Sequence, residues 1–247
     1  MRPNDPNHGE AAIWYLLHCG FAVKTHTKLL IFDYIPFYSE DKSIPLNPCL
    51  DNGFIDPEEL KNLDVCVFVS HEHRDHFNPV IFDWEKKIKK ITYFFGWQAS
   101  KSEKDNYLYM IGPRAEKKIN GMEVFTINSF HARVPEVAFL IKVDGLVIYF
   151  SGDYRGDYKN DNEHLRSKAN NVDIAFMNID HDGDDLKPNE ADFIEKLKPR
   201  IVFPMHYGND EEVLKRNADK VKKAGYRTKL NCVEKRGDRF FIDRVNN

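Results

Sequence analysis

Three imidazoles and one carboxylate follow directly on an apolar run in this chain. Residues 71–76 read His-Glu-His-Arg-Asp-His, and residues 65–70 have the apolar, β-branched character of a buried strand. The candidate ligands are His71, His73, Asp75 and His76. They converge only if the chain turns after the strand. Four such residues together are better explained as ligands of zinc, manganese or iron than as polar side chains of an ordinary surface loop. The chain is therefore expected to hold metal at a strand end.

The pattern of apolar residues predicts sheets covered by helices. Strand-like runs lie at 13–17, 21–24, 29–33, 65–70, 91–96, 107–111, 122–128, 137–143 and 146–150, with a helix at 79–88. From residue 159 the character alternates, with helices near 160–169, 189–197 and 210–224 and strands at 172–177, 200–204, 228–234 and 238–243. Meanders followed by alternation indicate a layered α/β sandwich. The Pro- and Asn-rich segment 34–57 is a long connection that is expected to be functional or flexible.

Composition narrows the class of protein. The chain has 247 residues, of which 42% are hydrophobic and 30% charged, and no repeat or linker divides it, so we expect one domain over 1–247. A net charge of −3 argues against nucleic acid and an anionic membrane as partners and favours a small-molecule substrate. Oligomeric state is not encoded in these features.

Cysteine usage and the N-terminus indicate a compartment. The four cysteines are widely scattered, without a Cys-x-x-Cys pair, which is typical of free thiols in reducing surroundings. The first ten residues lack an apolar core, and no stretch reaches the length of a membrane span. We expect a cytoplasmic protein.

Three further candidate ligands stand where predicted strands end. They are His131, Asp153 and His206. A rigid sheet fixes the side chains that follow its strands, so metal ligands are favoured at such positions. Together with the first four they make seven ligands, too many for one tetrahedral zinc but enough for two ions bridged by a carboxylate and a hydroxide.

The order of these motifs resembles the metallo-β-lactamase-fold hydrolase superfamily over nearly the whole chain. The segment 198–208, Lys-Pro-Arg-Ile-Val-Phe-Pro-Met-His-Tyr-Gly, is closest in wording to its L-ascorbate-phosphate-lactonase-like branch. The resemblance implies a four-layer αββα sandwich with two divalent metal ions, zinc first and manganese or iron as alternatives. It also implies that His71, His73 and His131 hold one ion, that Asp75, His76 and His206 hold the other, and that Asp153 bridges them.

The implied reaction is hydrolysis of a small phosphodiester, lactone or related ester by a bridging hydroxide, with Asp75 also orienting the nucleophile. The segment after His76 departs from the family's common wording, and this leaves the substrate open. No cysteine fills the bridging place, which argues against β-lactam hydrolysis.

Other residues near the predicted ligands are candidates for substrate contact or proton transfer. Those for substrate are Arg133, Tyr154, Arg155 and Tyr207, and His181 is a candidate catalytic acid. The plainer alternatives are a surface ion pair for Arg155 and a solvated loop for His181. His18 stands near a superfamily position that faces the site, but a lone histidine in a tight turn is more often structural.

Two other functions compete with the hydrolase. Iron in a related ligand set supports oxidoreductase chemistry, although His73 and the absence of an added flavodoxin-like region argue against the flavoprotein variant. A catalytically silent metal-binding protein is the third interpretation, and the seven competent ligands argue against it.

Overall fold

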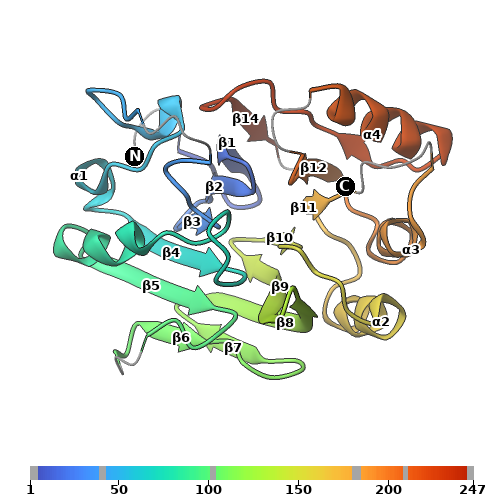
Figure 1. The fold of residues 1–247 in the computed structure, drawn as a ribbon, viewed down its shortest axis with the longest axis horizontal. Helices are drawn as coiled ribbons and strands as arrows, with labels where there is room; N and C mark the ends of the chain where they lie inside the picture. Colours follow the sequence, from blue (N-terminus) through green and yellow to red (C-terminus); the bar gives the residue numbers. More distant parts are fainter. Residues whose placement is uncertain (1–4, 39–42, 101–103, 180–184, 208–210, 244–247) are drawn as a thin grey trace. The chain divides into compact units, whose positions relative to one another are not determined.

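The chain forms two compact units. The computed structural model describes residues 5–38, 43–100, 104–179, 185–207 and 211–243. Unit 1 comprises residues 1–111 and 235–247, and unit 2 comprises residues 112–234. Each unit is built on its own seven-stranded sheet, and Figure 1 traces the strands of both.

The sheet of unit 1 is mixed. Its strands are β1 (Ala11–Leu17), β2 (Gly20–Lys24), β3 (Leu29–Phe32), β4 (Asp64–Val69), β5 (Lys90–Phe95), β6 (Tyr107–Tyr109) and β14 (Arg239–Ile242). They lie in the order β14-β1-β2-β3-β4-β5-β6, antiparallel from β14 to β3 and parallel from β3 to β6. The carboxyl ends of β3 and β4 therefore meet at one edge of the sheet.

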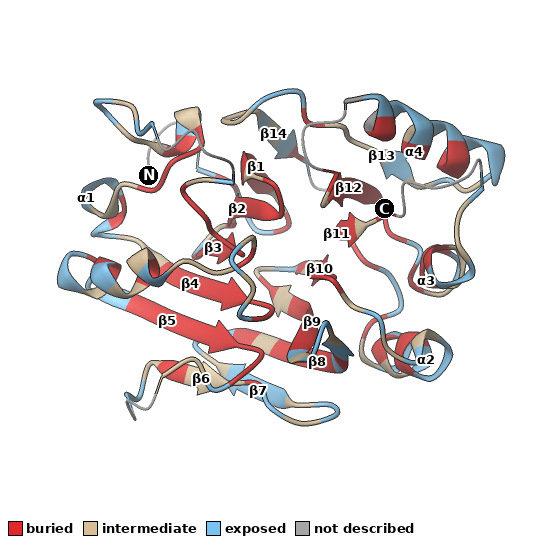
Figure 2. Ribbon diagram, viewed as in Figure 1, coloured by how far each residue is buried: buried red, intermediate tan, exposed pale blue. Residues whose placement is uncertain are grey.

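Apolar residues on both faces of β4 and β5 make the core of unit 1, and both strands are largely buried in Figure 2. The segment before β4 contains a short 3₁₀ helix, η1 (Leu50–Asn52), and the one-turn helix α1 (Pro57–Leu60). The helix expected at 79–88 is a 3₁₀ helix, η2 (Pro79–Lys86), whose Trp84 packs in the core. The backbone N–H groups of Ile81 and Lys87 donate to the carbonyls three residues earlier, those of Asn78 and Trp84, which is the hydrogen-bond pattern of a 3₁₀ helix.

The sheet of unit 2 combines hairpins with parallel strands. Its strands are β7 (Glu116–Ile119), β8 (Met122–His131), β9 (Val134–Val143), β10 (Leu146–Phe150), β11 (Ile174–Asn178), β12 (Ile201–Met205) and β13 (Lys229–Leu230). Their order is β13-β12-β11-β10-β9-β8-β7, with β7 to β10 antiparallel and β10 to β13 parallel. The carboxyl ends of β10, β11 and β12 consequently share one edge.

Helices cover one face of this second sheet. They are α2 (Tyr158–Lys168), α3 (Pro188–Leu197) and α4 (Glu211–Lys223). Leu165 of α2 and Phe193 of α3 pack with Tyr149 and Met177 of the sheet, so each helix buries one apolar stripe. Sheets with helices on them confirm the predicted α/β class. Among the described residues, no helix has the length and apolar composition that crossing a bilayer requires.

Candidate functional site

In unit 1, the predicted ligands of residues 71–76 lie just beyond the carboxyl end of β4. His71 and His76 are fully buried, whereas the side chain of Asp75 is 33% exposed. The chain turns directly after Ser70, and backbone hydrogen bonds from His76 and Phe77 to the carbonyl of His73 close the turn. The turn that the sequence required is therefore present.

A buried aspartate fixes the orientation of His76. Asp33 follows β3, and its Oδ2 lies 2.6 Å from Nδ1 of His76, with both side chains fully buried. Ser70 donates its backbone N–H to Oδ1 and its hydroxyl to Oδ2 of the same carboxylate, at 2.8 and 2.6 Å. Burial raises the pKa of Asp33, an effect opposed by its bonds to His76 and Ser70. With Nδ1 engaged, Nε2 of His76 is the atom that can bind a ligand.

The donor set in unit 1 fits a divalent metal ion. Nε2 of His71 lies 2.9 Å from Nδ1 of His73, while Nδ1 of His71 lies 3.0 Å from the hydroxyl of Ser70. Two imidazole nitrogens at this distance share one proton or bind one cation, whose ligands also stand about 3 Å apart. Nε2 of His76 and Oδ2 of Asp75 are 3.8 Å apart. Neutral nitrogen donors beside a carboxylate suit zinc, manganese or iron.

In unit 2, strand ends bring a second pair of predicted ligands together. Asp153 follows β10 and His206 follows β12, and Oδ2 of Asp153 lies 3.3 Å from Nε2 of His206. Asn178, at the end of β11, donates its Nδ2 to Oδ1 of Asp153 at 3.2 Å. Asp153 is only 3% exposed, so these neighbours define the direction of its carboxylate. The parallel register of the three strands explains the cluster.

His131 is half-buried and ends β8, where a two-residue turn joins this strand to β9. Arg133, the predicted substrate contact two residues later, is exposed in that turn. Both Ala132 and Arg133 have positive φ, 44° and 73°. This turn therefore holds non-glycine residues in a left-handed conformation.

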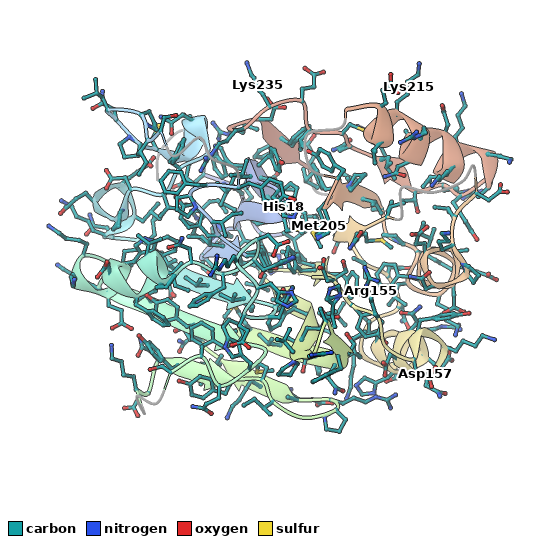
Figure 3. All side chains as sticks on the ribbon, viewed as in Figure 1. His18, Arg155, Asp157, Met205, Lys215 and Lys235 are labelled. Atoms are coloured by element: carbon teal, nitrogen blue, oxygen red, sulfur yellow. The ribbon has the colours of Figure 1, made fainter. Side chains whose placement is uncertain are left out.

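A cavity of about 210 Å³ opens in unit 2 beside the Asp153 cluster. Arg155, Lys187, Tyr154 and Asn178 line it, together with aromatic side chains of the sheet and of α2 and α3. Arg155 is exposed and is labelled in Figure 3. Tyr154 donates its hydroxyl to Asp161, and burial, reinforced by this carboxylate, raises the pKa of Tyr154. Asn178 thus contacts both the cavity and a predicted metal ligand.

Two further residues were predicted from the sequence to act at the site, His181 and Tyr207. His181 lies outside the described residues, so its catalytic role stays a prediction. Tyr207 is buried directly after His206. Sequence reasoning missed Asp33, although its place at the end of the strand-like run 29–33 was a usable signal; in the structure, β3 pairs with β4. It also missed Asn178, which was assigned only to a polar loop.

Comparison with known proteins identifies the superfamily of the chain. The family model described as a beta-lactamase superfamily domain matches residues 12–206. The chain belongs to this superfamily. A metal-dependent hydrolase of the UPF0173 family from Pyrococcus furiosus is 25% identical over 73% of this chain and 84% of its own length. Another from Methanosarcina mazei is 27% identical over 86% of this chain and 89% of its own length.

A solved structure gives the superfamily fold directly. Igni18, a metallo hydrolase from Ignicoccus hospitalis, aligns with a TM-score of 0.66 and 17% identity over 95% of this chain and 99% of its own. The predicted fold class, the α/β sandwich of the metallo-β-lactamase superfamily, is confirmed. The chain accordingly groups with metal-dependent hydrolases.

Proposed function

We propose that this chain hydrolyses a small phosphodiester, lactone or related ester at a site with two divalent metal ions. The observation that carries the proposal is the buried pair of Asp33 and His76, in which Asp33 engages Nδ1 and directs Nε2 toward Oδ2 of Asp75, 3.8 Å away. Zinc is the first choice of ion, with manganese or iron as alternatives. Superfamily membership supports the same chemistry.

The proposed ligands are the residues that match the order of metal-ligand motifs in the superfamily. We propose that one ion is held by His71, His73 and His131, the other by Asp75, His76 and His206, and that Asp153 contacts both. The contacts within each unit support this division, because His71 lies beside His73 and Asp153 lies beside His206. Bound divalent ions lower the pKa of coordinated water and stabilise negative charge that develops on a substrate.

Residues of the chain supply the remaining steps. Asp75 is the partly exposed carboxylate of its cluster; one of its oxygens would hold the ion, and the other would accept the proton that the attacking water loses. Arg155 and Lys187 present two cationic groups in the cavity beside Asp153, so they bind an anionic part of the substrate, such as a phosphate. The tyrosines of the cavity pack against the apolar part.

Metal analysis combined with an activity panel tests the proposal. The protein is purified without added metal, its ions are counted by mass spectrometry, and the same samples are assayed with bis(p-nitrophenyl) phosphate and neutral lactones. We expect two ions per chain, and we expect His73→Ala to lower kcat/KM by about 100-fold or more, about 2.7 kcal/mol in the transition state. Arg155→Ala should raise KM for the phosphodiester but leave lactone turnover unchanged.

His26→Ala is the matched control, because Nδ1 of His26 lies 3.1 Å from the carbonyl of Pro6, away from both clusters. Full activity in His73→Ala, or no bound metal even after reconstitution, would contradict the proposal. Bound iron with oxygen uptake and no hydrolysis would favour an oxidoreductase instead.

A further inference from the structure

His18 occupies a strained position that serves its side chain. It lies in the turn between β1 and β2 and is labelled in Figure 3. Its φ is 54°, a left-handed conformation that is uncommon for residues other than glycine. The backbone N–H of His18 donates to the hydroxyl of Tyr15 at 2.8 Å. Glycine and asparagine also adopt this backbone readily, so the turn alone does not require an imidazole.

The imidazole is buried and held on one side by an aromatic ring. His18 is only 2% exposed, and its ring stacks on Tyr38 with centroids 4.0 Å apart and planes 15° apart. This stacking limits rotation of the ring and shields it from water. Its Nε2 is thereby held toward the turn that follows β4.

Nε2 of His18 faces two of the predicted ligands of unit 1. It lies 3.5 Å from Oδ2 of Asp75, and the same oxygen lies 3.8 Å from Nε2 of His76. The three ligand atoms are all within 4.8 Å of one another. A distance of 3.5 Å is longer than a normal N–H···O hydrogen bond, whose range ends near about 3.2 Å.

These separations suit donors that surround a cation. With metal–ligand distances of about 2.0–2.2 Å, donors of one ion stand about 3–4 Å apart. The carboxylate of Asp75 also offsets part of the positive charge that a divalent ion brings into a partly buried cluster. The cluster draws on two segments 57 residues apart in sequence but on one unit only.

We propose that His18 is an additional ligand of the ion held by Asp75 and His76. The inference rests on the proposed metal site but extends it, because the seven ligands that the resemblance implies do not include this residue. His18 completes a nitrogen-rich set within unit 1, and this favours zinc or iron over magnesium or calcium at that position.

The test is cobalt(II) binding to the metal-free full-length chain. His18→Asn is the suitable variant because asparagine tolerates the left-handed backbone while removing the imidazole. We expect its affinity for cobalt, measured against a competing chelator, to fall by about 10-fold or more, with a changed visible absorption spectrum as one nitrogen ligand is lost. His26→Asn, a half-buried histidine outside the cluster, should retain both.

The outcomes separate this inference from the proposed function. If the wild-type chain binds no metal ion, the proposed function and the inference both fail. If it binds cobalt and His18→Asn keeps the same affinity and spectrum, only the role of His18 is overturned. Melting of the metal-free proteins identifies a structural role: a drop in melting temperature that accounts for the lost affinity would also overturn it.

Discussion

At the scale of single residues, the candidate site depends on the side chains that orient the predicted ligands as well as on the predicted ligands themselves. Asp33 receives two hydrogen bonds from Ser70 and contacts His76, so its carboxylate cannot rotate without losing three interactions. Asp33 also has a positive φ of 38°, which aspartate and asparagine tolerate better than most residues. The left-handed backbone and the need for a carboxylate beside His76 therefore both favour aspartate at this position.

Replacing Asp33 by asparagine should weaken metal binding while leaving the fold intact. The amide keeps the shape and the backbone conformation but loses the negative charge that orients His76 and raises its basicity. We expect metal affinity to fall by about 10–100-fold in a chelator competition. Asp173→Asn is the control, because this carboxylate accepts a backbone N–H from Val147 and contacts no predicted ligand in the described structure. Equal affinity in Asp33→Asn and wild type would remove Asp33 from the site.

At the scale of elements, three consecutive hairpins of unit 2 use the same two-residue turn with different residues. The turns between β7 and β8 and between β9 and β10 are Asn120-Gly121 and Asp144-Gly145, the residues that this turn type favours. The turn between β8 and β9 is Ala132-Arg133, with positive φ at both positions. This exception adjoins His131, which indicates that the turn is kept for function rather than stability.

Replacing Ala132-Arg133 by Asn-Gly should therefore stabilise the chain. Relief of left-handed strain is worth about 1 kcal/mol, equivalent to a rise of about 2–4 °C in melting temperature for a chain of this size. If Arg133 contacts substrate, KM rises although stability improves, and scanning calorimetry with steady-state kinetics separates the two effects. The single variant Arg133→Lys is the control, because it keeps a positive charge at this position and introduces no glycine. A melting temperature below that of wild type would show that the turn is not strained.

Patterns of apolar residues in the sequence made most of the helices and strands predictable. Other strands exist only because they form hydrogen bonds to a neighbouring strand. The run before His71 is apolar throughout, and its position as β4 was expected. In contrast, β7 reads Glu-Lys-Lys-Ile and is largely exposed, so only its hydrogen bonds to β8 make it a strand. Candidate ligands could be named from the sequence because metal binding is restricted to few residue types. Asn178 was not, because its role depends on which strands become neighbours.

At the scale of the whole molecule, the C-terminal segment returns to unit 1. β14 pairs with β1, and Arg236 donates from Nε to the carbonyl of Gly53 and from Nη1 to that of Pro36, both at 2.9 Å. Its guanidinium also lies 3.3 Å from the centroid of the Phe54 ring. Burial lowers the pKa of Arg236. Unit 1 is thus assembled from both ends of the sequence, and the expectation of one domain over 1–247 stays a prediction.

Arg236→Met tests that prediction, because methionine replaces the aliphatic part of the arginine side chain but removes both hydrogen bonds of the guanidinium. Leaving two carbonyls without these donors should lower the free energy of unfolding by about 2 kcal/mol or more. Hydrogen exchange then reports where the loss is felt. If 1–247 is one cooperative domain, amides in the cores of both sheets exchange faster by the same factor, whereas faster exchange restricted to unit 1 would mean that the units unfold separately. Arg239→Met is the control, since this exposed arginine of the same segment lies over Trp14 and should change exchange in neither sheet core.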